Sequence, residues 1–344
     1  MRLPARATFS TSEDIPAFDS IVPPISTSDL SELLCPQAAN LIALAPSSAI
    51  VTRTALTGGA SWLDTFFLAP GILTQQEAPK VNNGEYPATA AMTSGYIFRV
   101  ENQATVAYLQ RIGKTGHLVT VEVKRTAAGD FSYIDPVASL SYLAGIASTA
   151  FVAAALVRIE DYSALAFLGT LMTARFFNVA VMKRRSQLGW KGMEEPEVRG
   201  DLMILVSQDR WIRMRGLVDD LKEVTAGQWL QEMQPLDSFL ASASSLLVYG
   251  SMAFAWKASP LGSFLTAGLL ALSVALLGIC NATTTKLRMF GCVVGKEGEK
   301  KYNRRLEMAA EIIEETECYG DNKWAVRLGL VQELPGTKEK EVIL

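Results

Sequence analysis

Four long apolar runs dominate the hydrophobic pattern of this chain. They cover residues 137–157, 162–182, 236–256 and 260–282. The only charges inside them are Arg175, in the second run, and Asp237, at the edge of the third. A helix needs ~20 apolar residues to cross a hydrocarbon core about 30 Å thick. The runs therefore predict four membrane-spanning helices, because buried helices of soluble proteins are usually shorter and carry a polar edge.

Two short links join these runs in pairs. The sequence RIED (158–161) separates the first run from the second, and KASP (257–260) separates the third from the fourth. Links this short favour antiparallel neighbours. We therefore expect two helical hairpins, at residues 135–182 and 236–282, packed together as a four-span bundle.

Cations cluster at one end of the spans. Those that follow the second and fourth runs are Lys183, Arg184, Arg185, Lys191, Lys286, Arg288 and Lys296. The two tight links carry only Arg158 and Lys257. Loops rich in Lys and Arg stay on the cytoplasmic side of a membrane. The bias predicts that both termini and residues 183–235 face the cytoplasm, with the plasma membrane or the endoplasmic reticulum as the favoured location.

Arg175 places a permanent charge near the middle of the second span. Eight residues separate it from Lys183, which is about 12 Å of helix. Charged side chains at such depth face the bundle interior and pair with polar groups. We expect Arg175 to hydrogen-bond carbonyl or amide groups there. Asn178 shares its face, and Tyr249 and Asn281 from other spans complete a candidate intramembrane polar site.

The residues before the first span divide into two parts. Residues 1–94 are rich in Ser, Thr, Pro and Ala, and we expect them to be partly disordered. From residue 95 the hydrophobic period changes to two, which predicts a β-meander over 95–134 with strands in GYIFRVE, ATVAYLQRI and HLVTVEVKR. The GKTG turn before the last strand does not match a phosphate-binding loop, because such a loop needs glycine where Tyr108 stands.

Residues 183–235 predict a strand–helix segment. LMILV indicates a buried strand, RWIRMRG a second strand, and LVDDLKEVTAGQWL an amphipathic helix. Aromatic and basic side chains in and after this segment form a candidate cytoplasmic interaction surface. Its members are Trp211, Arg213, Arg215, Trp229 and Trp324. An anionic headgroup is one ligand for the face of Trp211, Arg213 and Arg215, and a solvated face without a partner is the favoured alternative, since charged faces are usually solvated.

Residues 283–344 predict an amphipathic helix in KEGEKKYNRRLEMAAEIIEETE and a strand in NKWAVRLGLVQEL. Cations near a membrane are attracted to anionic lipid. The candidate headgroup contacts in the two segments after the second and fourth spans are Lys183, Arg184, Arg185, Lys300, Lys301, Arg304 and Arg305. Packing of the helix on the sheet is the alternative. Residues 323–334 also echo residues 210–221 at Trp, Gly, Leu and Val positions, which suggests a duplicated unit.

Composition excludes several kinds of site. The net charge is −3, so no basic field attracts nucleic acid. The 4 cysteines are scattered without a CxxC pair, and there is 1 histidine, which argues against a disulfide framework and a structural zinc site. We expect no cofactor.

The segment SQDRWIRMRGLVDDLKEVTAGQWL, with a pair of spans on each side, resembles a group of uncharacterised multi-pass membrane proteins of filamentous fungi. The resemblance covers the layout of residues 95–334. It implies the fold and the membrane location only. The expected fold is membrane α-helical, a four-span bundle of two antiparallel hairpins with a small cytoplasmic α+β part that contains antiparallel strands.

No catalytic motif is evident, since HExxH, GxSxG, a Cys/His pair and paired intramembrane aspartates are all absent from the sequence. We therefore expect a non-enzymatic membrane protein whose cytoplasmic part recruits or regulates a protein partner. A small channel or transporter is the alternative, and its few intramembrane polar groups would require several copies to assemble as a homo-oligomer. A membrane-embedded enzyme is the least favoured class.

Overall fold

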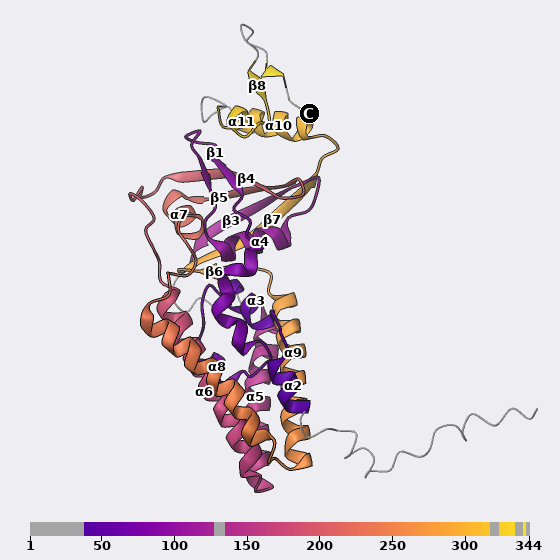
Figure 1. Cartoon of the computed structure of the whole chain (residues 1–344). Coiled ribbons are helices and arrows are strands. Elements are labelled where there is room, and N and C mark those ends of the chain that lie inside the picture. The colour runs from indigo at the N-terminus through magenta and orange to yellow at the C-terminus, as the bar shows by residue number, and fades with distance from the viewer. Residues whose placement is uncertain (1–37, 127–134, 317–322, 334–339, 342–344) are drawn as a thin grey trace, which may run out of the picture. The chain divides into compact units, whose positions relative to one another are not determined.

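Within the part of the chain that the structure describes, four helices are long and apolar enough to cross a membrane. They are α5 (Pro136–Arg158), α6 (Tyr162–Arg185), α8 (Pro235–Ala255) and α9 (Pro260–Thr283) (Figure 1). The computed structural model describes residues 38–126, 135–316, 323–333 and 340–341. Proline occupies the first position of α5, α8 and α9, where its missing N–H removes no helical hydrogen bond. The predicted apolar runs are thus confirmed as helices.

The most extensive helix packing joins α6 to α8 and α5 to α9. The closest partner of each long helix therefore comes from the other predicted hairpin. Gly145 and Thr149 are buried on α5, and the missing side chain of Gly145 leaves room for the Phe67 ring. Leu156, Phe167, Val248 and Leu277 are members of one apolar cluster to which all four helices contribute.

Residues 38–82 pack against both helix pairs. They form α2 (Ala38–Leu44), α3 (Ala49–Leu56) and two 3₁₀ helices, η2 (Trp62–Phe66) and η3 (Ile72–Asn82). The helix α2 contacts α8 and α9, η2 contacts α5 and α6, and η3 contacts α6 and α8. Residues 38–94 of the region predicted to be partly disordered are therefore folded, and residues 1–37 lie outside the described residues.

A seven-stranded sheet forms the second part of the molecule, in the order β2-β1-β4-β5-β3-β7-β6. The strands are β1 (Ala88–Ala91), β2 (Ile97–Arg99), β3 (His117–Arg125), β4 (Arg199–Val206), β5 (Arg210–Leu217), β6 (Leu287–Met289) and β7 (Cys292–Lys301). Neighbouring strands are antiparallel except β3 and β5, which pair in parallel with Val119 opposite Ile212. The expected antiparallel strands are present, with this one parallel pair added.

The predicted β-meander over 95–134 is wrong. Its middle strand is the helix α4 (Gln103–Ile112), and its last strand, β3, pairs with β5 and β7. The Asn102 side chain caps α4 by accepting a hydrogen bond from the Thr105 N–H at 3.1 Å. Val106 and Leu109 are buried and lie three residues apart, so this segment also has the apolar spacing of a helix face. Residues 127–134 of the predicted meander lie outside the described residues.

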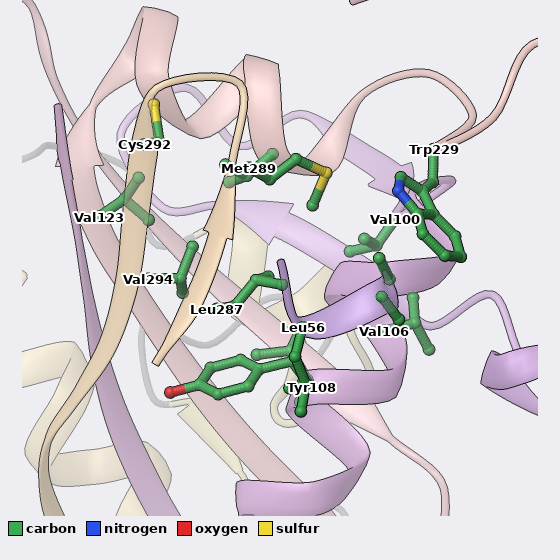
Figure 2. Packing of buried hydrophobic residues seen from close by; sticks show 14 of the residues in the cluster. Leu56, Val100, Val106, Tyr108, Val123, Trp229, Leu287, Met289, Cys292 and Val294 are labelled. Carbon is green, nitrogen blue, oxygen red and sulfur yellow. The ribbon is translucent and has the colours of Figure 1, made fainter. Parts of the chain in front are cut away.

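The sheet is covered on both faces, and neighbouring residues of a strand contribute to the two different cores. On one face, Val119, Val121, Ile212 and Met214 pack with α3, α4 and α7 (Val218–Thr225). Figure 2 shows this core, in which Leu56, Val100, Val106, Tyr108 and Trp229 lie near the β6–β7 residues Leu287, Met289 and Val294. On the other face, Leu118, Met203 and Trp211 pack with α10 (Arg305–Glu315) and α11 (Lys323–Arg327).

The C-terminal predictions need two corrections. Residues 296–301 belong to β7, so the predicted amphipathic helix is shorter and begins at Arg305. The predicted strand after it begins with the helix α11 and a turn, and β8 (Gln332–Glu333) follows, which pairs with β9 (Lys340–Glu341). Residues 210–221 form β5 and the start of α7, whereas residues 323–333 form α11 and β8. The two similar segments therefore do not share one structural unit.

Candidate functional site

Arg175 lies inside the helical bundle, and its side chain is 4% exposed. Its Nε donates to the main-chain oxygen of Asp64 at 3.1 Å, and its Nη1 donates to the side-chain oxygen of Gln75. Both acceptors are hydrogen-bonding groups that satisfy a guanidinium away from water. The expected carbonyl and amide partners are present, and they come from η2 and η3 rather than from another long helix.

Asn178 extends this polar network across the bundle. Its Nδ2 donates to the Ile72 main-chain oxygen at 3.0 Å and to Ser244 Oγ at 2.8 Å, and its Oδ1 accepts from Gln76 Nε2 at 2.8 Å. The Ser244 hydroxyl in turn donates to the Ala174 carbonyl at 2.9 Å. Three elements, α6, α8 and η3, are therefore held in register by buried hydrogen bonds.

The other two members of the predicted intramembrane site are elsewhere. Tyr249 is 58% exposed on the outside of α8, so its expected position in the bundle interior is wrong. Asn281 is buried, and its Nδ2 donates to the Ala49 main-chain oxygen at 2.8 Å. Sequence inspection missed Gln75 and Gln76 because they lie in a segment without helical or strand periodicity.

A cavity of about 500 Å³, here called the junction cavity, opens beside the Arg175 network at the end of α6. Its wall includes Arg53 from α3, Asp64 from η2, Tyr142 from α5 and Lys183 from α6. The Tyr142 hydroxyl donates to Asp64 Oδ1 at 2.5 Å, and the Ser61 main-chain N–H donates to Asp64 Oδ2 at 2.7 Å. Two cations and one hydrogen-bonded carboxylate therefore face the same space.

A smaller cavity of about 130 Å³ adjoins it and shares Arg53 and Thr57 as lining residues. Lys286 and Arg288 add two more cations to its wall, together with Asp135. The Asp135 carboxylate accepts from the Thr285 main-chain N–H at 2.9 Å. Positive charge therefore exceeds negative charge around the paired cavities.

The candidate cytoplasmic interaction surface is not a surface. Trp211, Trp229 and Trp324 are each buried. Arg213 is also buried, where Nη2 lies 2.7 Å from Asp201 Oδ2 and Nη1 pairs with Glu315. These side chains lie in the sheet cores or between the sheet and α10, and of the five only Arg215 is partly exposed. Trp211 and Arg213 alternate along β5 as an exposed face would, but α10 and α11 cover this face of the sheet.

The three candidate headgroup contacts at the end of α6, Lys183, Arg184 and Arg185, have different partners. Lys183 Nζ lies 5.4 Å from the centroid of the Trp62 ring. Arg184 Nε pairs with Asp237 at 2.9 Å. Arg185 is buried, and its Nε donates to the Gln231 main-chain oxygen at 2.8 Å. Lys183 therefore is the member of this group that remains best placed for a ligand.

The second group lies at the far end of β7. Lys300 is eight residues beyond Cys292, the first residue of β7, and this is roughly 26 Å along a strand. Lys300 pairs with Glu311 at 2.5 Å, and Arg305 pairs with Asp209 at 2.9 Å. Lys301 and Arg304 are exposed. These ion pairs favour the alternative in which this region packs on the sheet.

Asp220, Glu223 and Cys292 form a buried cluster that sequence inspection missed, because α7 and β7 are distant in the chain. Arg125 Nη2 lies 2.7 Å from Asp220 and 2.8 Å from Glu223, and Lys191 Nζ lies 3.0 Å from Glu223. Burial raises the pKa of the Cys292 thiol to about 12, and the Asp220 charge acts in the same direction. The thiol is therefore protonated at neutral pH, and the carboxylates already have cationic partners.

An open groove of about 330 Å³, here called the β2 groove, lies between β2, the start of β4 and α7. Its lining includes Tyr96, Phe98, Val198 and Leu221. The Tyr96 and Phe98 rings stack with centroids 6.1 Å apart, and Tyr96 is 66% exposed. Among the described strands, β2 ends the sheet and pairs only with β1, so its outer edge has unpaired backbone groups.

Comparisons with protein-family models, curated proteins and solved structures find no match for this chain. The resemblance to the fungal membrane proteins therefore stays a prediction. Of the arrangements described above, the junction cavity and the β2 groove have open space for a ligand. The Arg175 guanidinium and the Asp220 and Glu223 carboxylates already have partners in the protein.

Proposed function

We propose that this protein is a non-enzymatic, multi-pass integral membrane protein whose cytoplasmic α+β part recruits or regulates a partner protein. In this proposal α5–α6 and α8–α9 cross the bilayer as two antiparallel hairpins, with both termini on the cytoplasmic side. Large apolar side chains such as Leu140, Phe151 and Leu246 are exposed on the outside of the helices, which supports contact with lipid. The cations after α6 and α9 support the orientation.

The β2 groove is the observation that carries the recruiting function. It combines an unpaired strand edge with a pocket lined by aromatic and aliphatic side chains. An extended peptide can add to such an edge by main-chain hydrogen bonds and place side chains in the pocket. We therefore propose an extended segment of a cytoplasmic protein as the occupant.

Packing between the bundle and the sheet supports a fixed position for this groove. The helix α3 contacts α9 on one side and α4 and β6 on the other. Trp229 Nε1, in the sheet core, donates to the Gly58 main-chain oxygen at 3.0 Å. A partner bound at the β2 groove would be held at a defined place beside the membrane, which suits a recruiting protein.

Affinity capture of the full-length protein from its native membranes tests the proposal. Tyr96→Arg places a charge in the groove, and Tyr86→Arg is the matched control at another exposed tyrosine. We expect a partner that is recovered with the wild type and with Tyr86→Arg, and that binds Tyr96→Arg at least about tenfold more weakly, since buried aromatic anchors dominate interface energy. Recovery of the same proteins at the same yield with Tyr96→Arg would show that the groove does not dock a partner.

A homo-oligomeric channel or transporter is the second candidate. Buried polar side chains inside the bundle, Arg175 and Asn178, are the observation that favours it. Their donors bond to Asp64, Gln75 and Ser244, which indicates a packed interior within one copy. Solute flux into proteoliposomes distinguishes the candidates, because a recruiting protein leaves the vesicles as tight as protein-free ones.

A further inference from the structure

The junction cavity contains cations whose charge is not neutralised by the protein. Among the described residues, neither Arg53 nor Lys183 forms an ion pair with a carboxylate. The Arg53 guanidinium lies 5.3 Å from the Tyr142 ring centroid, and its Nη1 donates to Thr284 Oγ1 at 3.4 Å. The Lys183 ammonium lies beside the Trp62 ring. An aromatic face orients a cation without using its N–H donors, so both side chains can still bind an anion.

The one carboxylate in the wall of this cavity, Asp64, already has donors. Its two oxygens accept from the Tyr142 hydroxyl and the Ser61 main-chain N–H. Arg175 behind it donates to the Asp64 main-chain oxygen, which adds positive charge on the same side. The carboxylate therefore opposes an anion less than an unpaired one would.

Uncharged donors and two further cations surround the same space. Ser186 at the end of α6 contributes a hydroxyl, and the main-chain N–H groups of Gly59 and Ala60 lie in the lining loop. Arg288 lines the adjoining cavity, and its Nη2 is buried without a hydrogen-bond partner. An unsatisfied buried guanidinium nitrogen is costly unless a ligand completes its bonding. The chemistry of the paired cavities suits a phosphate group, which accepts from Arg, Lys, hydroxyl and main-chain donors.

An exposed aromatic surface lies directly beside these cations. Trp62 stacks on Phe176 of α6 with ring centroids 5.7 Å apart, and Trp62, Leu63, Phe66 and Phe176 are all exposed. A soluble phosphate has no apolar part that could bury this surface, whereas the acyl chains of a lipid would cover these apolar side chains. Tryptophan next to cations is also the usual composition of the membrane interface.

We propose that the junction cavity binds the anionic headgroup of a phospholipid, with the acyl chains lying along Trp62, Phe66 and Phe176. Arg53 and Lys183 contact the headgroup phosphate, and Arg288 extends the positive charge into the adjoining cavity. The inference rests on the membrane insertion proposed above, but it does not depend on the β2 groove. Failure of lipid binding with normal partner capture would therefore separate the two proposals.

Lipid titration of the full-length, delipidated protein in detergent, followed by native mass spectrometry, tests the site. Phosphatidylserine is the anionic probe and phosphatidylcholine the zwitterionic one. The variants are Lys183→Gln and Arg53→Gln, and Lys257→Gln is the control at an exposed cation in the α8–α9 link. We expect the wild type and Lys257→Gln to prefer phosphatidylserine, and each cavity variant to bind it about fivefold more weakly.

Two further arms separate the sources of phosphate and the effects on folding. Inorganic phosphate and glycerophosphoserine serve as competitors, and they should displace the lipid poorly because they lack acyl chains. Arg53 contacts Tyr142 and Thr284, so Lys183→Gln decides the test if Arg53→Gln lowers the thermal unfolding midpoint. Equal binding of the two lipids, or unchanged phosphatidylserine binding by Lys183→Gln, would overturn the proposal. Competition by glycerophosphoserine at the affinity of the lipid would assign the site to a soluble phosphate instead.

Discussion

At the scale of single residues, Arg175 shows how the bundle accommodates a permanent charge. The cost of burying a guanidinium is offset when carbonyl oxygens satisfy its N–H groups. The Asp64 carbonyl and the Gln75 side chain supply those oxygens. Arg175 therefore holds α6 against η2 and η3 through hydrogen bonds.

Arg175→Leu is expected to destabilise the protein by about 3 kcal/mol, because it leaves the buried Gln75 and Asp64 acceptors without a donor. Thermal unfolding of the purified protein in detergent, followed by the loss of the monodisperse chromatographic peak, measures the change. Arg158→Leu, at the exposed end of α5, is the control and should change the midpoint little. An Arg175→Leu variant that unfolds with the wild-type midpoint would show that these hydrogen bonds do not stabilise the bundle.

At the scale of elements, the long helices pack against a segment that has no long helix of its own. Gly145 on α5 permits this packing, because a Cβ at that position would lie 2.1 Å from the Phe67 ring. Phe67 also stacks on Tyr142, with ring centroids 5.5 Å apart. The close approach of α5 to the segment after η2 therefore depends on a missing side chain.

Gly145→Ala is expected to destabilise the protein by about 2 kcal/mol, since an added methyl group in a filled core forces displacement. Gly268→Ala on α9 is the matched control, because a Cβ there meets no atom within 4 Å. The control should be neutral or slightly stabilising, since Ala favours helix over Gly. Thermal unfolding of both variants decides the point, and equal midpoints would mean that Phe67 moves aside without cost.

At the scale of the whole molecule, orientation is the property on which both proposals depend. The α8–α9 link contains the exposed Lys257, and the exposed Asn303 lies between β7 and α10. If both termini are cytoplasmic, these two positions lie on opposite sides of the membrane.

Maleimide labelling of single-cysteine variants in intact membranes measures this arrangement. In a background with Cys35→Ser and Cys318→Ser, the remaining Cys280 and Cys292 are buried and should react slowly. We expect Asn303→Cys to react with an impermeant reagent from the cytoplasmic side and Lys257→Cys to react only from the other side. The reverse pattern would invert the proposed topology, and reaction of both from one side would exclude membrane insertion.

The sequence by itself determined the features that depend on local length and composition. The four apolar helices follow from run length, and β3, β4 and β5 follow from period-two or continuous apolar patterns. The interior position of Arg175 follows from the cost of a charge in an apolar run. These predictions need no knowledge of what lies next to each element.

Only the tertiary structure decided which groups meet and which faces are covered. Asp64 and Gln75 lie about a hundred residues from Arg175 in the chain, in a segment without periodicity, so no local pattern pairs them. Trp211 and Arg213 are buried because α10 and α11 cover the second face of the sheet. The segment over α4 satisfies both a strand and a helical pattern, and long-range packing selects the helix. Hydrophobic patterns specify that a face is buried, whereas the partner that buries it is set by contacts distant in sequence.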